Sequence, residues 1–363
     1  MLRRKNRAAV FSFVLAFTSR AAAQEPARFS LESVFAVDEF AGENASNRPQ
    51  IVIDVSLAVR MGDNWQLLVR PWFRLPRPSS PTAPVPDWDR ELYQAGLRYE
   101  RRGAIATRVD VGQILSPIGL GLYDVRPGVN PTIVPHLSYL TPMPAFDPTV
   151  PRVSAVSATY PLGGQVTVSG AHWDTRAAVV NSAPTRIYAI GAVTNPRATP
   201  VFVAGGGVTP ITGLRLGASL AHGLYATREE ITVAVPDGRA MTMASGEGEW
   251  AFDGTKISGE ILRTGFESLG GTSVAYEWFV QGRQTLTPRL FVAARRAGTS
   301  APPLVNGIVV GSRTDLETFE ATAGFRVTTD VTLRSSYYTR RFYGSTDWVN
   351  QVGVSAVWSR RWW

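Results

Sequence analysis

The sequence predicts an all-β protein, a transmembrane antiparallel β-barrel of about sixteen strands. Three observations predict this fold. Apolar and polar residues alternate over stretches of about ten residues, which is the pattern of a strand with one apolar and one polar face. Short turns and long loops also alternate along the chain, as in outer-membrane barrels. No apolar run has the roughly 18 residues that a membrane-spanning helix needs.

The first 23 residues have the three parts of a secretory signal peptide. Residues 1–7 are basic, residues 8–18 form a short apolar run, and Ala21 and Ala23 make a small-x-small exit before Gln24. We therefore expect cleavage after Ala23, which leaves residues 24–363 as the barrel. An N-terminal anchor is the alternative, but the apolar run is too short to span a bilayer as a helix.

Removal of this segment changes the charge of the chain. The segment holds five basic and no acidic residues, so its loss lowers the formal charge from +8 to +3. No basic run remains that would support binding of nucleic acid, and no such partner is expected. The chain has no cysteine, so an exported form must be stabilised by packing or by closure of a large sheet.

The alternation is clearest in five stretches. In residues 51–61 the odd positions are apolar and the even positions include Asp54 and Arg60, and residues 65–74, 93–100, 274–283 and 318–326 alternate in the same way. A large secreted β-sandwich also alternates, but a closed barrel additionally satisfies every edge strand, as lipid requires. Aromatic residues that fit interfacial girdles lie near strand ends: Phe29, Phe35, Trp65, Phe73, Tyr93, Tyr99, Trp348 and Trp358.

The connections give the strand count. Short turns are expected at 62–64, 101–104, 161–164, 209–213, 253–255, 285–288 and 328–330. Long loops are expected near 41–49, 77–89, 115–151, 176–199, 225–247, 266–272, 298–313 and 342–346. Seven short and eight long connections join sixteen strands, with an uncertainty of about two, because residues 186–194 can be read as a further strand or as loop.

The stretch "VGQILSPIGLGLYDVRPGVNPTIVPHLSYLTPMPAFDPTVP", residues 111–151, joins a strand end to a long loop. Strand patterns flank it at 105–113 and, as we predict, at 152–160. Long irregular loops are uncommon and are usually functional or disordered, and this one is too apolar for a disordered tail. Its prolines fix φ and remove backbone donors that would otherwise need partners.

The chain resembles Gram-negative outer-membrane porins, nearest to the group that includes the phosphate-selective porins. The stretches that carry the likeness are "VDVGQILSPIGLG" (109–121), "GEWAFDGTKISGEILRTGFE" (248–267) and "FVQGRQTLTPRLFVAAR" (279–295), followed by the closing hairpins. The resemblance covers essentially the whole mature chain at the level of pattern. It implies a sixteen-stranded, usually homotrimeric barrel in outer-membrane lipid that passes small hydrophilic solutes, without a cofactor.

The resemblance also implies a role for residues 111–151. In porins the third long loop folds into the barrel and narrows the pore, and the few charges of this stretch, Asp124, Arg126 and Asp147, are then the candidates for the constriction. The alternative is an external loop that covers a contact between subunits. A lysine-rich phosphate-binding ladder is absent, because Lys256 is the one lysine after residue 23.

Side-chain parity predicts which charges face the lumen. The predicted pore-lining residues are Arg70, Arg74, Arg98, Arg108, Asp110, Arg283, Arg326, Arg334 and Arg340, and further inward acids include Asp54, Glu260, Glu277 and Glu320. Basic residues outnumber acidic ones, which favours a weak preference for anions. Arginine–carboxylate pairs that brace the wall are the alternative explanation.

Other functions have weaker support. His136 and Ser138 match the bare His-x-Ser spacing of outer-membrane phospholipases, but they lie between prolines with no evident partner. No phosphate loop or metal-binding spacing is present, and no metal site or catalytic residue is expected. A non-porin barrel, as an adhesin, a structural barrel with a blocked lumen or a channel for hydrophobic substrates, is the rival class. The C-terminal assembly signal is either Trp358 or the pair Trp362 and Trp363.

Overall fold

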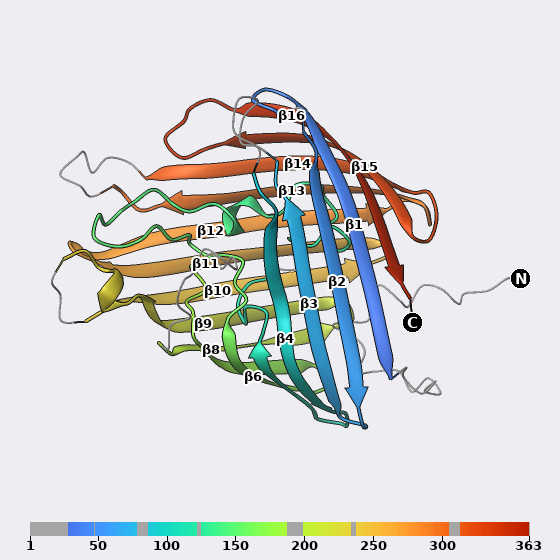
Figure 1. Cartoon of the computed structure of the whole chain (residues 1–363), viewed down its shortest axis with the longest axis horizontal. Helices are drawn as coiled ribbons and strands as arrows, with labels where there is room; N and C mark the ends of the chain where they lie inside the picture. The colour runs from blue at the N-terminus through green and yellow to red at the C-terminus, as the bar shows by residue number, and fades with distance from the viewer. Residues whose placement is uncertain are drawn as a thin grey trace, which may run out of the picture.

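A closed barrel of sixteen antiparallel strands forms the protein, with β1 paired to β16 (Figure 1). The computed structural model describes residues 28–46, 48–77, 86–121, 125–186, 199–233, 237–304 and 313–362. The expected signal peptide and most of residues 186–194 lie outside the described residues. The strands are β1 Phe29–Gly42, β2 Gln50–Met61, β3 Trp65–Leu75, β4 Asp89–Arg101, β5 Ala106–Gln113, β6 Leu162–Ser169, β7 Trp173–Val180, β8 Val201–Ile211, β9 Leu214–Ala226, β10 Arg239–Phe252, β11 Thr255–Ser268, β12 Gly271–Thr285, β13 Leu290–Ala301, β14 Thr314–Arg326, β15 Val331–Arg341 and β16 Val349–Arg361.

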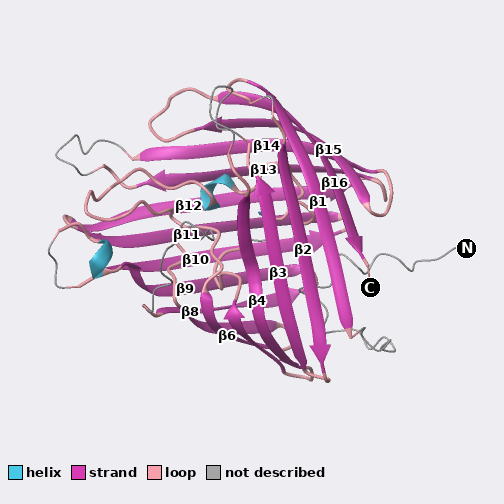
Figure 2. Ribbon diagram, viewed as in Figure 1, coloured by secondary structure: helices cyan, strands magenta, loops and turns pink. Residues whose placement is uncertain are grey.

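The predicted fold class and strand number are confirmed. Each strand pairs with its neighbour in the sequence, so the connections are simple hairpins and no sheet edge is left open. Two short 3-10 helices, η2 Leu137–Tyr139 and η3 Arg228–Glu230, interrupt the described connections (Figure 2). None of the described helices has the length and hydropathy to cross a membrane.

The two faces of the wall differ as the alternation predicts. On β12 the side chain of Val280 is 55% exposed, whereas its neighbours Phe279 and Gln281 are buried. Large apolar residues make up the exposed face around the barrel, among them Leu97, Val166, Phe202, Leu220, Ile261, Leu333 and Val354. An apolar outer band of this kind is the surface that a barrel presents to lipid.

Residues 152–160 correct one prediction. They form no strand, and three of the four residues of the expected turn at 161–164 belong instead to β6, which begins at Leu162. The turn between β6 and β7 lies at 170–172. Residues Val153 to Tyr160 are all buried, whereas a strand of the wall must leave every second side chain exposed to lipid. The alternation in this stretch was therefore a misleading signal.

The connection near 266–272 corrects a second prediction. A long loop is expected there, but β11 runs to Ser268 and β12 begins at Gly271. Only Leu269 and Gly270 separate the strands, and Gly271 has a φ of +118°. Glycine adopts positive φ at little cost, so this sequence makes a tight hairpin rather than a loop.

The C-terminal strand keeps one register to its end. β16 pairs with β1 through Arg361 opposite Glu32, and the backbone N–H of Trp362 donates to the carbonyl of Leu31 (2.9 Å). The Trp362 and Trp358 rings lie edge to face with centroids 5.9 Å apart. Trp358 and Trp362 therefore continue one outward row, and Trp363 lies outside the described residues.

Candidate functional site

On the inner face of the wall, four arginines of β3 to β5 are paired with carboxylates. Arg70 forms a buried ion pair with Asp54, and Arg74 bonds to Asp89 at 2.8 Å. Asp110 accepts a hydrogen bond from Arg98 (2.6 Å) and forms an ion pair with Arg108 (3.1 Å). These four arginines, all predicted to line the pore, thus have carboxylate partners that compensate their charge. On β3 to β5, these arginines therefore form the wall-bracing pairs with carboxylates that were the alternative to a pore lining.

The other predicted pore-lining arginines have different surroundings. Among the described residues, no carboxylate lies within ion-pair distance of Arg283, Arg326 or Arg340. Arg283 instead lies over the Phe291 ring, 4.4 Å from its centroid. Arg340 lies over the Phe342 ring, 4.6 Å from its centroid. Uncompensated positive charge on the inner face is therefore concentrated on β12, β14 and β15.

Arg334 is buried and holds the long connection between β5 and β6, residues 114–161, which we call the segment. Its Nη1 donates to the carbonyl oxygens of Thr132 (2.7 Å) and Asn130 (2.9 Å), and its Nη2 donates to Ser355 Oγ (2.9 Å). Asp38 lies 3.8 Å away. The guanidinium is thus committed to the backbone of the segment, and only 5% of Arg334 is exposed.

Buried carboxylates of the wall bind the same connection. Glu320 on β14 accepts from the backbone N–H groups of Ile133 (2.8 Å) and Val134 (3.1 Å). Glu260 on β11 accepts from the Leu120 N–H (2.6 Å) and from the Tyr139 hydroxyl (2.9 Å). Buried backbone N–H groups need an acceptor, so these two side chains fix the segment to β11 and β14.

Further contacts come from β11 and β13. Thr264 on β11 donates to the carbonyl of Ala155 (2.8 Å). Arg295 on β13 donates to the carbonyl of Val134 and lies 3.7 Å from Glu320. Sequence reasoning did not single out Arg295, although its place in the inward row of β13 was a usable signal.

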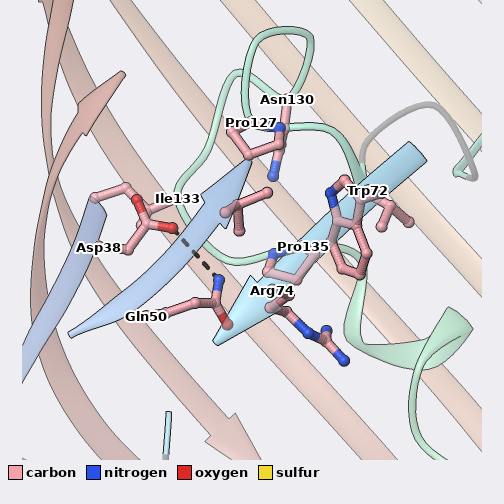
Figure 3. Close-up of a pocket in the computed structure, with 10 residues that line it drawn as sticks. Asp38, Gln50, Trp72, Arg74, Pro127, Asn130, Ile133 and Pro135 are labelled. Atoms are coloured by element: carbon pink, nitrogen blue, oxygen red, sulfur yellow. Dashed lines mark hydrogen bonds between the residues drawn. The ribbon is translucent and has the colours of Figure 1, made fainter. Parts of the chain in front are cut away.

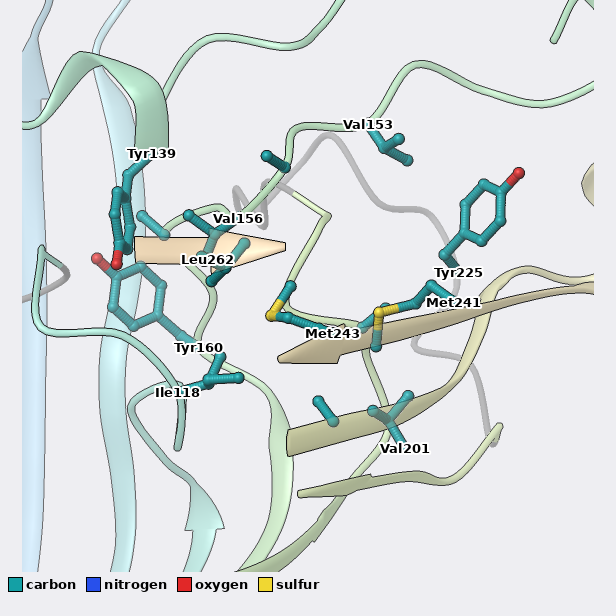
Figure 4. Close-up of a cluster of buried hydrophobic side chains, with 14 of the residues drawn as sticks. Ile118, Tyr139, Val153, Val156, Tyr160, Val201, Tyr225, Met241, Met243 and Leu262 are labelled. Carbon is teal, nitrogen blue, oxygen red and sulfur yellow. The ribbon is translucent and has the colours of Figure 1, made fainter. Parts of the chain in front are cut away.

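An apolar core forms where the segment meets the wall. Ile118, Tyr139, Val156 and Tyr160 of the segment belong to one buried cluster with Leu262, Met241 and Met243 of the strands (Figure 4). Tyr160 stacks on Tyr93 of β4, with centroids 4.1 Å apart. Burial on this scale stabilises by about 1.5–3 kcal/mol for each large side chain. These contacts pack the segment against β4, β10 and β11.

The three predicted constriction charges have separate positions. Asp124 lies outside the described residues, and Arg126 is half-buried. Asp147 is 2% exposed and accepts from Thr149 Oγ1 (2.6 Å), from the Thr149 N–H (2.8 Å) and from the Leu269 N–H (2.7 Å). Burial raises the pKa of Asp147, but these hydrogen bonds and nearby Arg239 together bring it below the usual value. Asp147 thus ties the segment to the β11–β12 hairpin.

His136 and Ser138 meet Glu277, a partner that the sequence did not reveal. Ser138 Oγ lies 2.9 Å from His136 Nδ1 and donates to Glu277 Oε1 (3.1 Å). All three residues are buried, and burial together with the charge of Arg295 lowers the pKa of His136 well below its usual value. The Ser138–Glu277 hydrogen bond joins the connection between β5 and β6 to β12.

A small pocket lies where the segment faces β1 to β3. Asp38, Gln50, Trp72 and Arg74 line it from the wall, and residues 125–135 line it from the segment (Figure 3). The Arg74 guanidinium lies over the Trp72 ring, 5.0 Å from its centroid. Gln50 Nε2 donates to Asp38 Oδ2 at 3.4 Å. Polar groups of both charges therefore surround this gap.

Known structures share the architecture. OmpF of Salmonella typhi in complex with daunomycin has 10% identity and a TM-score of 0.60, with 92% of this chain and 97% of that chain covered. The trimer form of OmpT from Vibrio cholerae has 12% identity and a TM-score of 0.57, with 92% and 99% covered. The fold is that of an outer-membrane porin barrel.

An anion-selective porin from Comamonas acidovorans shows the same likeness, at 10% identity, a TM-score of 0.56 and coverage of 92% of this chain and 99% of that chain. No protein-family model matches the chain, and no curated protein matches it. At this level of identity the likeness shows the porin fold alone.

Proposed function

We propose that the protein is an outer-membrane porin, a passive diffusion channel for small hydrophilic solutes with a weak preference for anions. The porin fold and the apolar outer band support insertion in lipid. The observation that carries the selectivity is the uncompensated positive charge of Arg283, Arg326 and Arg340 on the inner face. Arginine keeps its charge at all relevant pH values, so such residues favour anions in a pore.

The segment between β5 and β6 is the proposed constriction. Its anchoring by Arg334, Glu260 and Glu320 supports a fixed narrowing rather than a mobile flap. The half-buried Arg126 and the small pocket between the segment and β1 to β3 support a passage on that side of the barrel. Asp147 serves as a tie of the segment rather than as a charge of the passage.

A structural barrel with a blocked lumen is the second candidate. The extensive apolar core between the segment and β10 to β12 favours it, because that part of the interior is filled by side chains. Single-channel recording in planar bilayers separates the two candidates. A porin gives stepwise conductance with a reversal potential displaced toward that of chloride in a salt gradient, and a blocked barrel gives no steps.

Export and assembly complete the proposal. We propose that residues 1–23 are removed on export, and mass spectrometry of the outer-membrane form tests this by finding a chain that starts at Gln24. The trimer form of OmpT supports a homotrimer. Cross-linking of the folded protein in native membranes, with a three-chain species as the expected product, tests that assembly.

A further inference from the structure

Two arginines lie over one aromatic cluster on the inner face, at the ends of the strands that lead into the long connections. Arg77 follows β3, and its guanidinium lies over the Phe40 ring, 4.5 Å from the centroid. Arg340 on β15 lies over Phe342 at 4.6 Å and over Tyr338 at 6.0 Å. The Phe40 and Tyr338 rings contact each other edge to face, with centroids 6.3 Å apart.

The aromatic cluster is rigid. Phe40 and Tyr338 are buried with Ile133 of the inward segment. Phe40 lies close over the backbone of Gly353, where an added Cβ would come within 2.6 Å of the ring. The two arginines thus have a fixed platform, and a guanidinium over an aromatic face is attracted by the ring quadrupole.

The positive charges of this pair are not neutralised by ion pairs. Among the described residues, no carboxylate lies within ion-pair distance of Arg77 or Arg340. Arg77 Nη2 donates to the neutral Gln351 Oε1 (3.2 Å). Asp38 offsets part of the Arg77 charge, but its carboxylate lies 3.8 Å from Arg334, and Asp89 bonds to Arg74. Residues 78–85, which follow Arg77, contain no acidic residue.

Each of the two guanidinium groups has one nitrogen atom that no hydrogen-bond acceptor reaches. Arg77 Nη1 and Arg340 Nε are buried nitrogen atoms without a hydrogen-bond partner. Burial lowers the pKa of Arg77, and the charge of Arg340 lowers it further. Two adjacent cations with unsatisfied donors raise the energy of the empty site, and an oxyanion that accepts from both relieves it.

We propose that Arg77 and Arg340 form an oxyanion-binding site at the entrance of the barrel, which recognises phosphate or carboxylate groups of passing solutes. The proposal rests on the proposed channel function and names the class of solute that the anion preference serves. Arginine binds both groups through paired N–H donors. The site lies beside Ile133, so it captures the anion where the inward segment meets the wall.

The test uses the full mature chain in planar bilayers and two probe anions, inorganic phosphate and succinate. Either probe, added during chloride conduction, is expected to reduce the single-channel current of the parent protein. In the double variant Arg77→Gln with Arg340→Gln, the half-blocking concentration should rise about tenfold or more. Block by phosphate alone or by succinate alone assigns the site to that oxyanion. Equal block of the parent and the double variant overturns the proposal.

Arg341→Gln is the matched control, because Arg341 is adjacent in sequence but bonds on the outer face to Glu317 (2.7 Å). Either probe anion should block the current of this control at the same concentration as in the parent. A loss of block as large as that in the double variant would contradict the site. Titration calorimetry of phosphate or succinate into the detergent-solubilised protein separates the two proposals. Binding that depends on Arg77 and Arg340 in a protein without conductance would keep the site and reject the channel. Conductance without such binding would do the reverse.

Discussion

Arg334 donates a 2.7 Å hydrogen bond to the carbonyl of Thr132, across 202 residues of sequence. The bond joins β15 to the connection between β5 and β6, and the Asn130 carbonyl accepts from the same nitrogen. A single buried cation thus satisfies backbone acceptors that a chain without regular structure would otherwise leave unpaired. This contact explains how a long irregular segment is held in one place.

The first prediction follows from that contact. Arg334→Met should leave the carbonyls of Asn130 and Thr132 without a donor, at a cost of about 1–3 kcal/mol for each unsatisfied group. We expect a folded barrel whose thermal unfolding temperature falls and whose single-channel current becomes noisier. Arg296→Met is the control, because Arg296 is an exposed residue of the outer face. Identical noise in both variants would contradict the anchoring role.

The sequence predicted the strands of the barrel wall better than the position of the segment inside the barrel. The wall follows from alternation, because a strand between lipid and interior must change polarity at every residue. Residues 152–160 alternate too, but Val153 and Ser154 are both buried, so local pattern alone could not place them inside. The partners Glu277 and Ser138 are 139 residues apart, and only the closure of the barrel brings them together.

The charges show the same limit. Parity identified Arg334 and Glu320 as inward residues, but it could not tell a residue that faces a passage from one that holds a backbone. That distinction depends on where the segment lies against the wall. Parity did not identify Arg77 as an inward residue, because it follows the end of β3 and lies beyond the alternating pattern.

The second prediction tests the two faces of the wall. Val166 on β6 is exposed on the apolar outer face, and Gln165 beside it is half-buried and faces inward opposite Asp110. Val166→Arg should destabilise the membrane-embedded barrel by roughly 2–4 kcal/mol. Gln165→Arg should be tolerated, because a side chain on the inner face of a barrel does not have to enter lipid. The two variants are compared by chemical unfolding in lipid vesicles, and equal stabilities would reverse the assignment of the faces.

The third prediction concerns the pH dependence of the tie at Asp147. Its folded pKa lies below the usual value, so the ionised carboxylate contributes stability that is present above the unfolded pKa of about 3.9. That contribution is lost as the pH falls through the folded pKa. Asp147→Asn should therefore lower the unfolding temperature at pH 7 and have a smaller effect near pH 3, as measured by circular dichroism in detergent. A difference that stays constant with pH would show that the charge of Asp147 is not what stabilises.

The last prediction tests the segment as the narrowest part of the pore. Residues 125–135 contribute Val125, Pro127, Asn130, Ile133 and Pro135 to the pocket beside the wall, and their removal should widen the passage. We expect a folded, heat-modifiable barrel with larger single-channel conductance and weaker ion selectivity. Selectivity should fall because a charge in a wide lumen is screened within about 8 Å at physiological salt.

Arg126→Glu separates charge from width, because it reverses the charge while it keeps the segment in place. In a salt gradient its reversal potential should move toward that of the cation, with conductance close to that of the parent. Conductance and selectivity unchanged by both the deletion and the substitution would place the narrowest section elsewhere. The wall arginines 283 and 326, whose charges are uncompensated, would then be the groups to replace next.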